Sequence, residues 1–241
     1  MLWWSHFSAL GGLNVSVAGA LAIAGWLAVM RCWRAALAWC LAFGGTMLVA
    51  AGTQMAFIGW GIGVRSLDFA GFSGHAARAA VLYPAALFLL FERVDRPLRR
   101  AGFVLGVLVA ATVAYARVAI GAHSVSEALA GWMLGSCAAL LFAARAETSC
   151  GPVRNPLLAG LALPLLLLPY AEPAGARQWI TGLSLALSGH DRPYLRGSWE
   201  LAGFPYVPPC APEKLHLGYL CLAGEQATDG MIRLSTKPGK P

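Results

Sequence analysis

The sequence contains few charged residues, and this limits the class of protein. Only 12% of its 241 residues are Asp, Glu, Lys or Arg, whereas a soluble domain carries roughly 25%. No charged residue lies between His6 and Arg31, or between Arg34 and Arg65. Each of these runs exceeds the roughly 20 apolar residues that a helix needs to cross a bilayer. The shortage of charge excludes an ordinary soluble domain and indicates an integral membrane protein.

Other absences narrow the function. The six cysteines show neither a CxxC pair nor the spacing of metal ligands, so they predict no metal site. The net charge is +7, but the basic residues are not interleaved with aromatic residues along one face. We therefore expect no nucleic-acid partner. The first residues lack the positive region of a signal peptide, which predicts that the first apolar run is kept as a membrane helix.

The apolar runs predict an all-α fold, a polytopic membrane bundle of about six transmembrane helices. The expected spans are Leu10–Met30, Ala36–Ile58, His75–Phe91, Gly102–Ala119, Val125–Ala144 and Pro156–Tyr170. These spans make up a transmembrane domain at residues 1–171, and an extramembrane extension follows at residues 172–241.

The extension is polar and rich in proline beyond its first residues. The segment Gln178–Leu187 is too short to span and is expected to lie along the membrane surface. The stretch Ser188–Pro193 is interpreted as a loop, with a substrate contact as the alternative. Cys210 and Cys221 would pair only in an oxidising compartment.

The basic residues predict the orientation of the helices. They cluster in the loops after the first, third and fifth spans, at Arg31, Arg34, Arg93, Arg96, Arg99, Arg100, Arg145 and Arg154. Because positive residues concentrate in cytoplasmic loops, both termini are expected on the outer side. The sequence thus predicts a multi-pass protein of the inner (cytoplasmic) membrane, with its termini facing the periplasm.

The first polar cluster is Ser73-Gly74-His75, at the start of the third expected span. A serine before a helix is a favoured N-cap, and the free amides of a helix start bind anions. A histidine there is able to donate a proton to a leaving oxygen. The alternative is an interfacial histidine beside an ordinary helix cap.

The second polar cluster runs from Arg117 to Glu127 and contains His123. On a helix, His123 and Glu127 share one face because they are four residues apart. A carboxylate beside one ring nitrogen fixes the tautomer and prepares the other nitrogen as a nucleophile or base. Arg117 offers a fork of donors that suits phosphate. The alternative is a structural Arg–Glu pair beside a histidine that only packs.

By the predicted topology both clusters lie on the outer side, and together they resemble motifs of the type 2 phosphatidic acid phosphatase superfamily. Ser73-Gly74-His75 is similar to its PSGH motif. The segment from Arg117 to Glu127 resembles its third motif: an Arg, five residues, a His, three residues and an Asp. The order of the two motifs and the six-span layout are similar too.

The resemblance implies a role for each matched residue. His123 would attack phosphorus and form a phosphohistidine, Glu127 would orient it, and His75 would protonate the leaving group. The phosphoryl oxygens would be held by Ser73, the amide of Gly74 and Arg117. No metal or cofactor is implied, because the arginine and the helix amides stabilise the charge.

The sequence departs from the family pattern in several places. Phe72 stands in place of the usual Pro, and Ala116 in place of the Ser before the Arg. Glu127 replaces Asp and moves the carboxylate by one methylene, and a misplacement of about 1 Å is able to cost roughly 10²-fold in rate.

The first motif, a Lys, then six residues, then Arg-Pro, is largely missing. Gln54 or Ile58 stands where the Lys is expected. Arg65, or Arg78 one helical turn after His75, is expected to supply part of the phosphate charge. The alternative for Arg65 is that it reaches from the interface toward water.

These inferences favour a metal-independent phosphatase that removes phosphate from a lipid phosphate or diphosphate at the outer face of the membrane. Its partners would be that substrate and the membrane lipids, with the oligomeric state left open. One alternative is a lipid phosphotransferase that uses the same histidine. Others are a catalytically degenerate lipid-binding protein and a transporter or channel.

Overall fold

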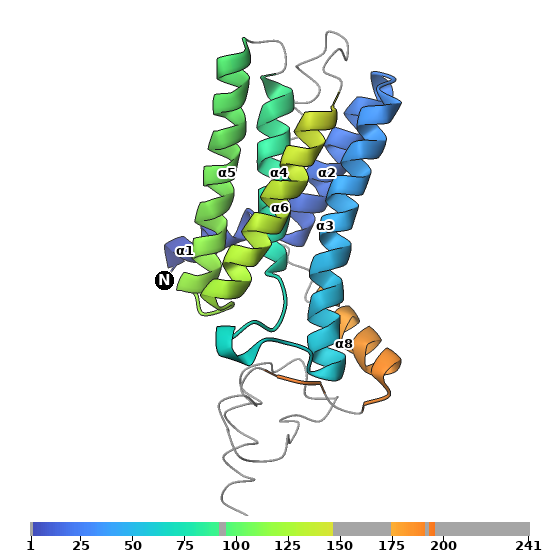
Figure 1. Cartoon of the computed structure of the whole chain (residues 1–241), viewed down its shortest axis with the longest axis vertical. Coiled ribbons are helices and arrows are strands. Elements are labelled where there is room, and N and C mark those ends of the chain that lie inside the picture. Colours follow the sequence, from blue (N-terminus) through green and yellow to red (C-terminus); the bar gives the residue numbers. More distant parts are fainter. Residues whose placement is uncertain (1, 92–94, 147–174, 191–192, 196–241) are drawn as a thin grey trace, which may run out of the picture. The chain divides into compact units, whose positions relative to one another are not determined.

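The computed structural model describes residues 2–91, 95–146, 175–190 and 193–195. Within these ranges every regular element is a helix (Figure 1). The elements are α1 (Leu2–Ala9), α2 (Leu13–Val29), α3 (Trp33–Trp60), the 3-10 helix η1 (Arg65–Leu67), α4 (Gly74–Leu90), α5 (Arg96–Ala119), α6 (Val125–Arg145) and α8 (Gly175–Ser188). The prediction of an all-α membrane protein is confirmed.

Four helical stretches are long and apolar enough to cross a membrane, and α4 is a shorter apolar helix. The four are Trp3–Val29, Trp33–Trp60, Arg96–Ala119 and Val125–Arg145. The predicted count of six is therefore only roughly matched among the described residues. The sixth expected span, Pro156–Tyr170, lies outside them, as do Cys210 and Cys221.

The first apolar run is divided, which the sequence analysis did not anticipate. Helix α1 ends at Ala9 and α2 begins at Leu13, whereas the expected span began at Leu10. The break falls at Gly11 and Gly12, and each glycine costs a helix about 1 kcal/mol relative to alanine. We call the segment Ser8–Gly12, which joins the two helices, the N-terminal turn.

The chain forms two compact units. The first comprises Met1–Gly52 and Gly71–Pro173, and the second comprises Thr53–Ala70 and Ala174–Pro241. Both polar clusters fall in the first unit. The sequence predicts a boundary after residue 171, between the transmembrane domain and the C-terminal extension, and this boundary remains a prediction.

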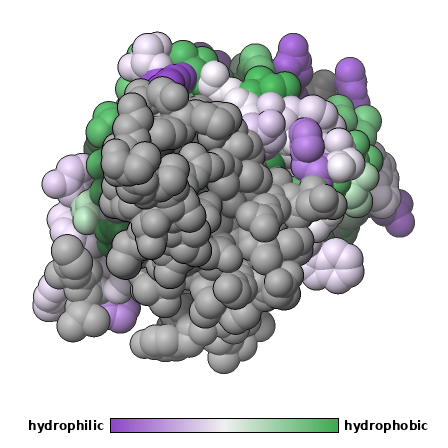
Figure 2. All heavy atoms as spheres, turned by 90° about the horizontal axis from the view of Figure 1, so that it is seen from below, coloured by the Kyte–Doolittle hydropathy of each residue, from purple (hydrophilic) through white to green (hydrophobic). Residues whose placement is uncertain are grey.

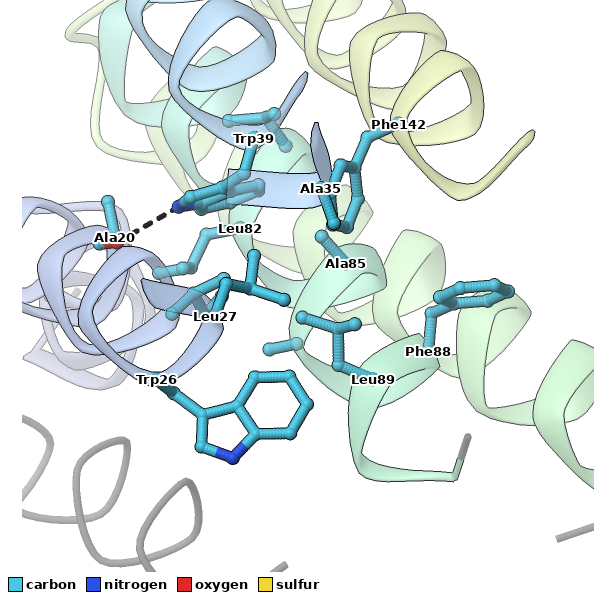
Figure 3. Close-up of a cluster of buried hydrophobic side chains, with 13 residues drawn as sticks. Ala20, Trp26, Leu27, Ala35, Trp39, Leu82, Ala85, Phe88, Leu89 and Phe142 are labelled. Atoms are coloured by element: carbon cyan, nitrogen blue, oxygen red, sulfur yellow. Dashed lines mark hydrogen bonds between the residues drawn. The ribbon is translucent and has the colours of Figure 1, made fainter. Parts of the chain in front are cut away.

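The core of the first unit lies where α2, α3, α4 and α6 meet (Figure 3). Trp39 of α3 is 1% exposed, and its indole nitrogen donates a 2.9 Å hydrogen bond to the carbonyl oxygen of Ala20 on α2. Its ring meets the edge of Phe142 on α6, with 5.3 Å between the ring centroids. A buried indole N–H needs such an acceptor, because leaving it unsatisfied carries the full cost of desolvation.

Helix α4 is the most enclosed helix of this unit and packs against α2, α5 and α6 (Figure 1). Glycines allow the close approach. A Cβ at Gly106 of α5 would lie 2.5 Å from backbone atoms of Pro84. On α6, a Cβ at Gly131 would lie 2.6 Å from the carbonyl oxygen of Ser73. A Cβ at Gly135 would collide with the carbonyl oxygen of Ala77. The Gly-x-x-x-Gly spacing of α6 thus brings its backbone against the start of α4, as in other membrane helix pairs.

The long helices expose apolar side chains on their outward faces. Leu37, Leu41 and Leu48 of α3 are each more than 60% exposed, and α5 and α6 present similar leucines. Figure 2, seen from below, shows apolar side chains at the surface along the edges of this face. So many large exposed apolar side chains are unusual on a soluble monomer and fit contact with lipid.

The second unit holds the end of α3 together with α8. The Nδ1 of His190 lies 2.7 Å from the carbonyl oxygen of Gly59. The backbone amide of Tyr194 donates a 2.9 Å hydrogen bond to the carbonyl oxygen of Ile58. The described part of Ser188–Pro193, interpreted above as a loop, is thus held against α3. Helix α8 exposes Trp179, 81% accessible, and also Leu183 and Leu187, while it buries Thr181 and Ser184. A location of α8 at the membrane surface remains a prediction that this pattern favours.

Candidate active site

Ser73 stands at the N-cap of α4, as predicted, but its side chain makes no capping hydrogen bond. The residue is fully buried, and its Oγ has no hydrogen-bond partner among the described residues. Its backbone amide donates to the carbonyl oxygen of Glu127 at 3.1 Å. The start of α4 is therefore tied directly to the first turn of α6, and a buried hydroxyl is left able to serve a ligand oxygen.

The start of α6 positions the second histidine. The hydroxyl of Ser124 accepts from the Glu127 amide, and the Glu127 carboxylate accepts from the Ser124 amide, both at 3.3 Å. This reciprocal capping box satisfies two free donors of the helix start. The same carboxylate oxygen, Oε2, lies 2.7 Å from Nδ1 of His123.

The Glu127–His123 contact determines which nitrogen of the imidazole ring carries the proton. The Glu127 side chain is 2% exposed and that of His123 is 19% exposed. A carboxylate only accepts, so Nδ1 of His123 carries the proton and Nε2 carries the lone pair. The extra methylene of Glu127, relative to the family's Asp, does not prevent the contact.

Arg117 and His123 are brought together by the turn between α5 and α6. The amide of His123 donates to the carbonyl oxygen of Arg117 at 3.3 Å. Gly121 lies in this turn with a φ of +71°. Glycine adopts this left-handed conformation without the steric cost of a side chain. The guanidinium of Arg117 donates from Nη1 to Oγ of Ser8, in the N-terminal turn, at 2.7 Å.

His75 lies one turn before Arg78 on α4. Nη2 of Arg78 lies 3.2 Å from Nδ1 of His75, and its Nε donates to the carbonyl oxygen of Gly11 at 3.0 Å. A guanidinium only donates, so Nδ1 of His75 accepts and the proton of the neutral ring is on Nε2. The two histidines therefore hold opposite tautomers. His123 presents a lone pair on Nε2, and His75 presents an N–H.

Two comparisons with known proteins identify the family of the chain. The sequence model of the PAP2 superfamily matches residues 63–149, which contain both polar clusters. A Klebsiella pneumoniae protein described as "Uncharacterized 22.5 kDa protein in cps region" is 34% identical over 199 residues, which are 80% of this chain and 95% of that protein. The chain belongs to the PAP2 superfamily. Its members are generally phosphatases, so the fold is of the phosphatase type. No solved structure matches the chain.

Most of the residues predicted from the PAP2 motifs lie in one compact unit. They are Ser73, Gly74, His75, Arg78, Arg117, His123 and Glu127. Hydrogen bonds join α4 to α6, His123 to Glu127, and Arg78 to His75. Arg65 belongs to the second unit, where it is exposed. The catalytic and phosphate-binding roles of all these residues, Arg65 and Arg78 included, remain predictions.

The sequence analysis missed three features of this PAP2 site. The Ser124-x-x-Glu127 capping box was readable from its spacing. Ser8 and Gly11 were not readable, because they lie outside the matched residues and contact arginines that are 109 and 67 positions further along the chain. Among the described residues, no group of three His, Cys, Asp or Glu is placed to hold a metal ion.

Proposed function

We propose that this protein hydrolyses a lipid phosphate or lipid diphosphate through a phosphohistidine on His123. The observation that supports the proposal best is the His123–Glu127 contact of 2.7 Å, because it leaves Nε2 of His123 as the nucleophile. The hydrogen bond between Ser73 and Glu127 supports the proposal too, because it joins the start of α4, where free amides are able to bind an anion, to the residue that contacts His123.

In the first step, the lone pair on Nε2 of His123 attacks phosphorus, and the bond from phosphorus to the leaving oxygen breaks. Electrons of that bond depart with the oxygen. Arg117, Ser73 and the amide of Gly74 bind the phosphoryl oxygens, where negative charge develops. Glu127 stabilises the positive charge that the phosphorylated ring gains.

His75 acts at the leaving oxygen in this proposal. With Nδ1 accepting from Arg78, its Nε2–H donates a hydrogen bond that stabilises the departing charge, as a neutral imidazole is able to do. Full proton transfer would require His75 to be protonated on both nitrogens, which removes the lone pair that Arg78 contacts. The arrangement therefore favours a diphosphate, whose leaving group is a stable phosphate anion, over a monophosphate, which releases an alkoxide.

In the second step, water attacks the phosphorus of the phosphohistidine and the N–P bond breaks. Both protons of the water leave with the product as dihydrogen phosphate. Nε2 of His123 recovers its lone pair, and the neutral ring returns to the tautomer that Glu127 selects. The two steps balance without a further base.

The apolar helices around the site support a lipid as the substrate. The helices that carry it are apolar and expose leucines outward, so the phosphate of a lipid reaches the helix starts from the bilayer. The basic loops predict that this side is periplasmic. Right-side-out membrane vesicles supplied with a substrate that does not cross the membrane should release phosphate outside. Activity seen only in inverted vesicles would contradict the predicted orientation and indicate a site on the cytoplasmic side.

The function is tested by phosphate release from the purified protein in detergent, with chelator present. A panel of lipid monophosphates and diphosphates is compared between the wild-type protein and His123→Ala. Release that persists in chelator and is lost in the variant is expected. Equal release by the variant would remove His123 as the nucleophile, and transfer of labelled phosphate to a lipid, without free phosphate, would indicate a phosphotransferase.

A further inference from the structure

The N-terminal turn is bound to the helices that carry both motifs. Arg117 of α5 donates to Oγ of Ser8, Arg78 of α4 donates to the carbonyl oxygen of Gly11, and the hydroxyl of Tyr83 donates to that of Leu10 at 2.8 Å. Three donors from two helices thus hold a segment of five residues. The PAP2 match begins at residue 63 and does not include this segment.

Gly11 brings the turn against the backbone of the first motif. A Cβ at this position would lie 2.6 Å from the carbonyl oxygen of His75 and 2.8 Å from Cγ1 of Val113. Contacts below 3.0 Å are not tolerated, so only glycine fits without a shift of the chain. The turn is therefore packed on the same helix start that carries His75.

Ser8 presents a hydroxyl group next to Arg117. The residue is 4% exposed, and its Oγ lies 2.7 Å from Nη1 of Arg117. Because the guanidinium only donates, the serine oxygen accepts and its own O–H remains as a donor. A hydroxyl and a guanidinium held side by side form two donors that suit one phosphoryl group.

We propose that Ser8 is a phosphate-binding residue of this active site, whose hydroxyl donates to the phosphoryl group that Arg117 also binds. The inference rests on the proposed function. It adds a part of the site that the motifs do not contain, supplied by the end of α1. The rest of the N-terminal turn, through its bonds to Arg78 and Tyr83, holds this hydroxyl in place.

The test uses a pair of variants of nearly equal volume. Ser8→Thr keeps the hydroxyl, and Ser8→Val replaces it with a methyl group, so both add the same bulk at a buried position. Ser8→Ala serves as a smaller variant should the larger side chains prevent folding. Ser5→Ala, an exposed serine on the same helix, is the control that leaves activity unchanged.

Three quantities are measured on the full chain in detergent: kcat/KM for the best lipid substrate, the inhibition constant of inorganic phosphate, and the shift in Tm that phosphate causes. We expect Ser8→Val and Ser8→Ala to weaken phosphate inhibition and lower kcat/KM by about tenfold or more, the effect of losing one hydrogen bond to a charged group. Ser8→Thr should retain most of both.

The outcomes separate this proposal from the proposed function. If the wild-type protein releases phosphate but Ser8→Val and Ser8→Ala match it, the role of Ser8 is overturned and the phosphatase stands. A loss of turnover with unchanged phosphate inhibition would reduce Ser8 to a support for Arg117 and also overturn the proposal, as would equal damage by Thr and Val. If the wild-type protein releases no phosphate, the Tm shift decides. A shift in the wild-type protein that Ser8→Val lacks supports the site, and no shift in either overturns both inferences.

Discussion

The backbone amide of Ser73 donates a 3.1 Å hydrogen bond to the carbonyl oxygen of Glu127. This bond joins the two segments that the sequence motifs identify, although they lie more than 50 residues apart. Because it is made by backbone atoms, it sets the separation of the two helix starts independently of the side chains that we propose perform the chemistry. Helix packing therefore determines the relative positions of the proposed catalytic side chains.

The first prediction concerns the carboxylate behind His123. Glu127→Gln should lower kcat by about 10²-fold, because a neutral amide no longer stabilises the charge on the phosphorylated ring and no longer selects one tautomer. Glu127→Asp restores the residue usual in the family but shortens the side chain, and should cost about tenfold here because the 2.7 Å contact is built around glutamate. Single-turnover phosphate release checks both variants, and higher activity in Glu127→Asp would support a degenerate wild-type site.

The second prediction concerns the contact between Arg78 and His75. The wild-type protein should prefer farnesyl diphosphate over farnesyl monophosphate, since His75 is held as a neutral donor. Arg78→Ala frees Nδ1 of His75 for protonation, so the ratio of kcat/KM for the two substrates should fall by about tenfold or more. Full general acid catalysis contributes roughly 10²–10⁴-fold. His75→Ala is measured in parallel. An unchanged ratio in Arg78→Ala would show that the 3.2 Å contact does not set the protonation of His75.

The motif residues were predictable because their chemistry is encoded over short distances. His123 lies four residues before Glu127, just ahead of the N-cap of α6, and Ser73 precedes the first residue of α4. The break at Gly11 and Gly12 was missed because apolar composition continues through it. The contact between Ser8 and Arg117 joins residues 109 positions apart. No local sequence pattern predicts a tertiary contact between residues so far apart.

The role of Arg65 could not be predicted from its position in the sequence alone. The sequence predicts that it supplies part of the phosphate charge, because it lies near the expected position of the first motif. The structure places it on η1, in the second unit, where its side chain is exposed. Arg65→Ala should therefore leave kcat unchanged if it only reaches toward water, and should raise KM for every phosphate substrate if it binds phosphate. Steady-state kinetics on two lipid phosphates decides between these results.

The last prediction concerns the packing that holds the two helix starts together. A Cβ at Gly131 would lie 2.6 Å from the carbonyl oxygen of Ser73, so Gly131→Ala should push α6 from α4 and lengthen the Ser73–Glu127 bond. We expect a loss of about 1–3 kcal/mol in stability and a larger proportional loss in kcat, because the histidines separate. Gly44→Ala on α3 is the matched control, since nothing lies within 4 Å of its added Cβ. It should keep full activity and gain a few tenths of a kcal/mol or more from better helix propensity. If Gly131→Ala lowers Tm but retains kcat, helix packing does not set the catalytic geometry, and the histidines must be positioned by their own side-chain contacts.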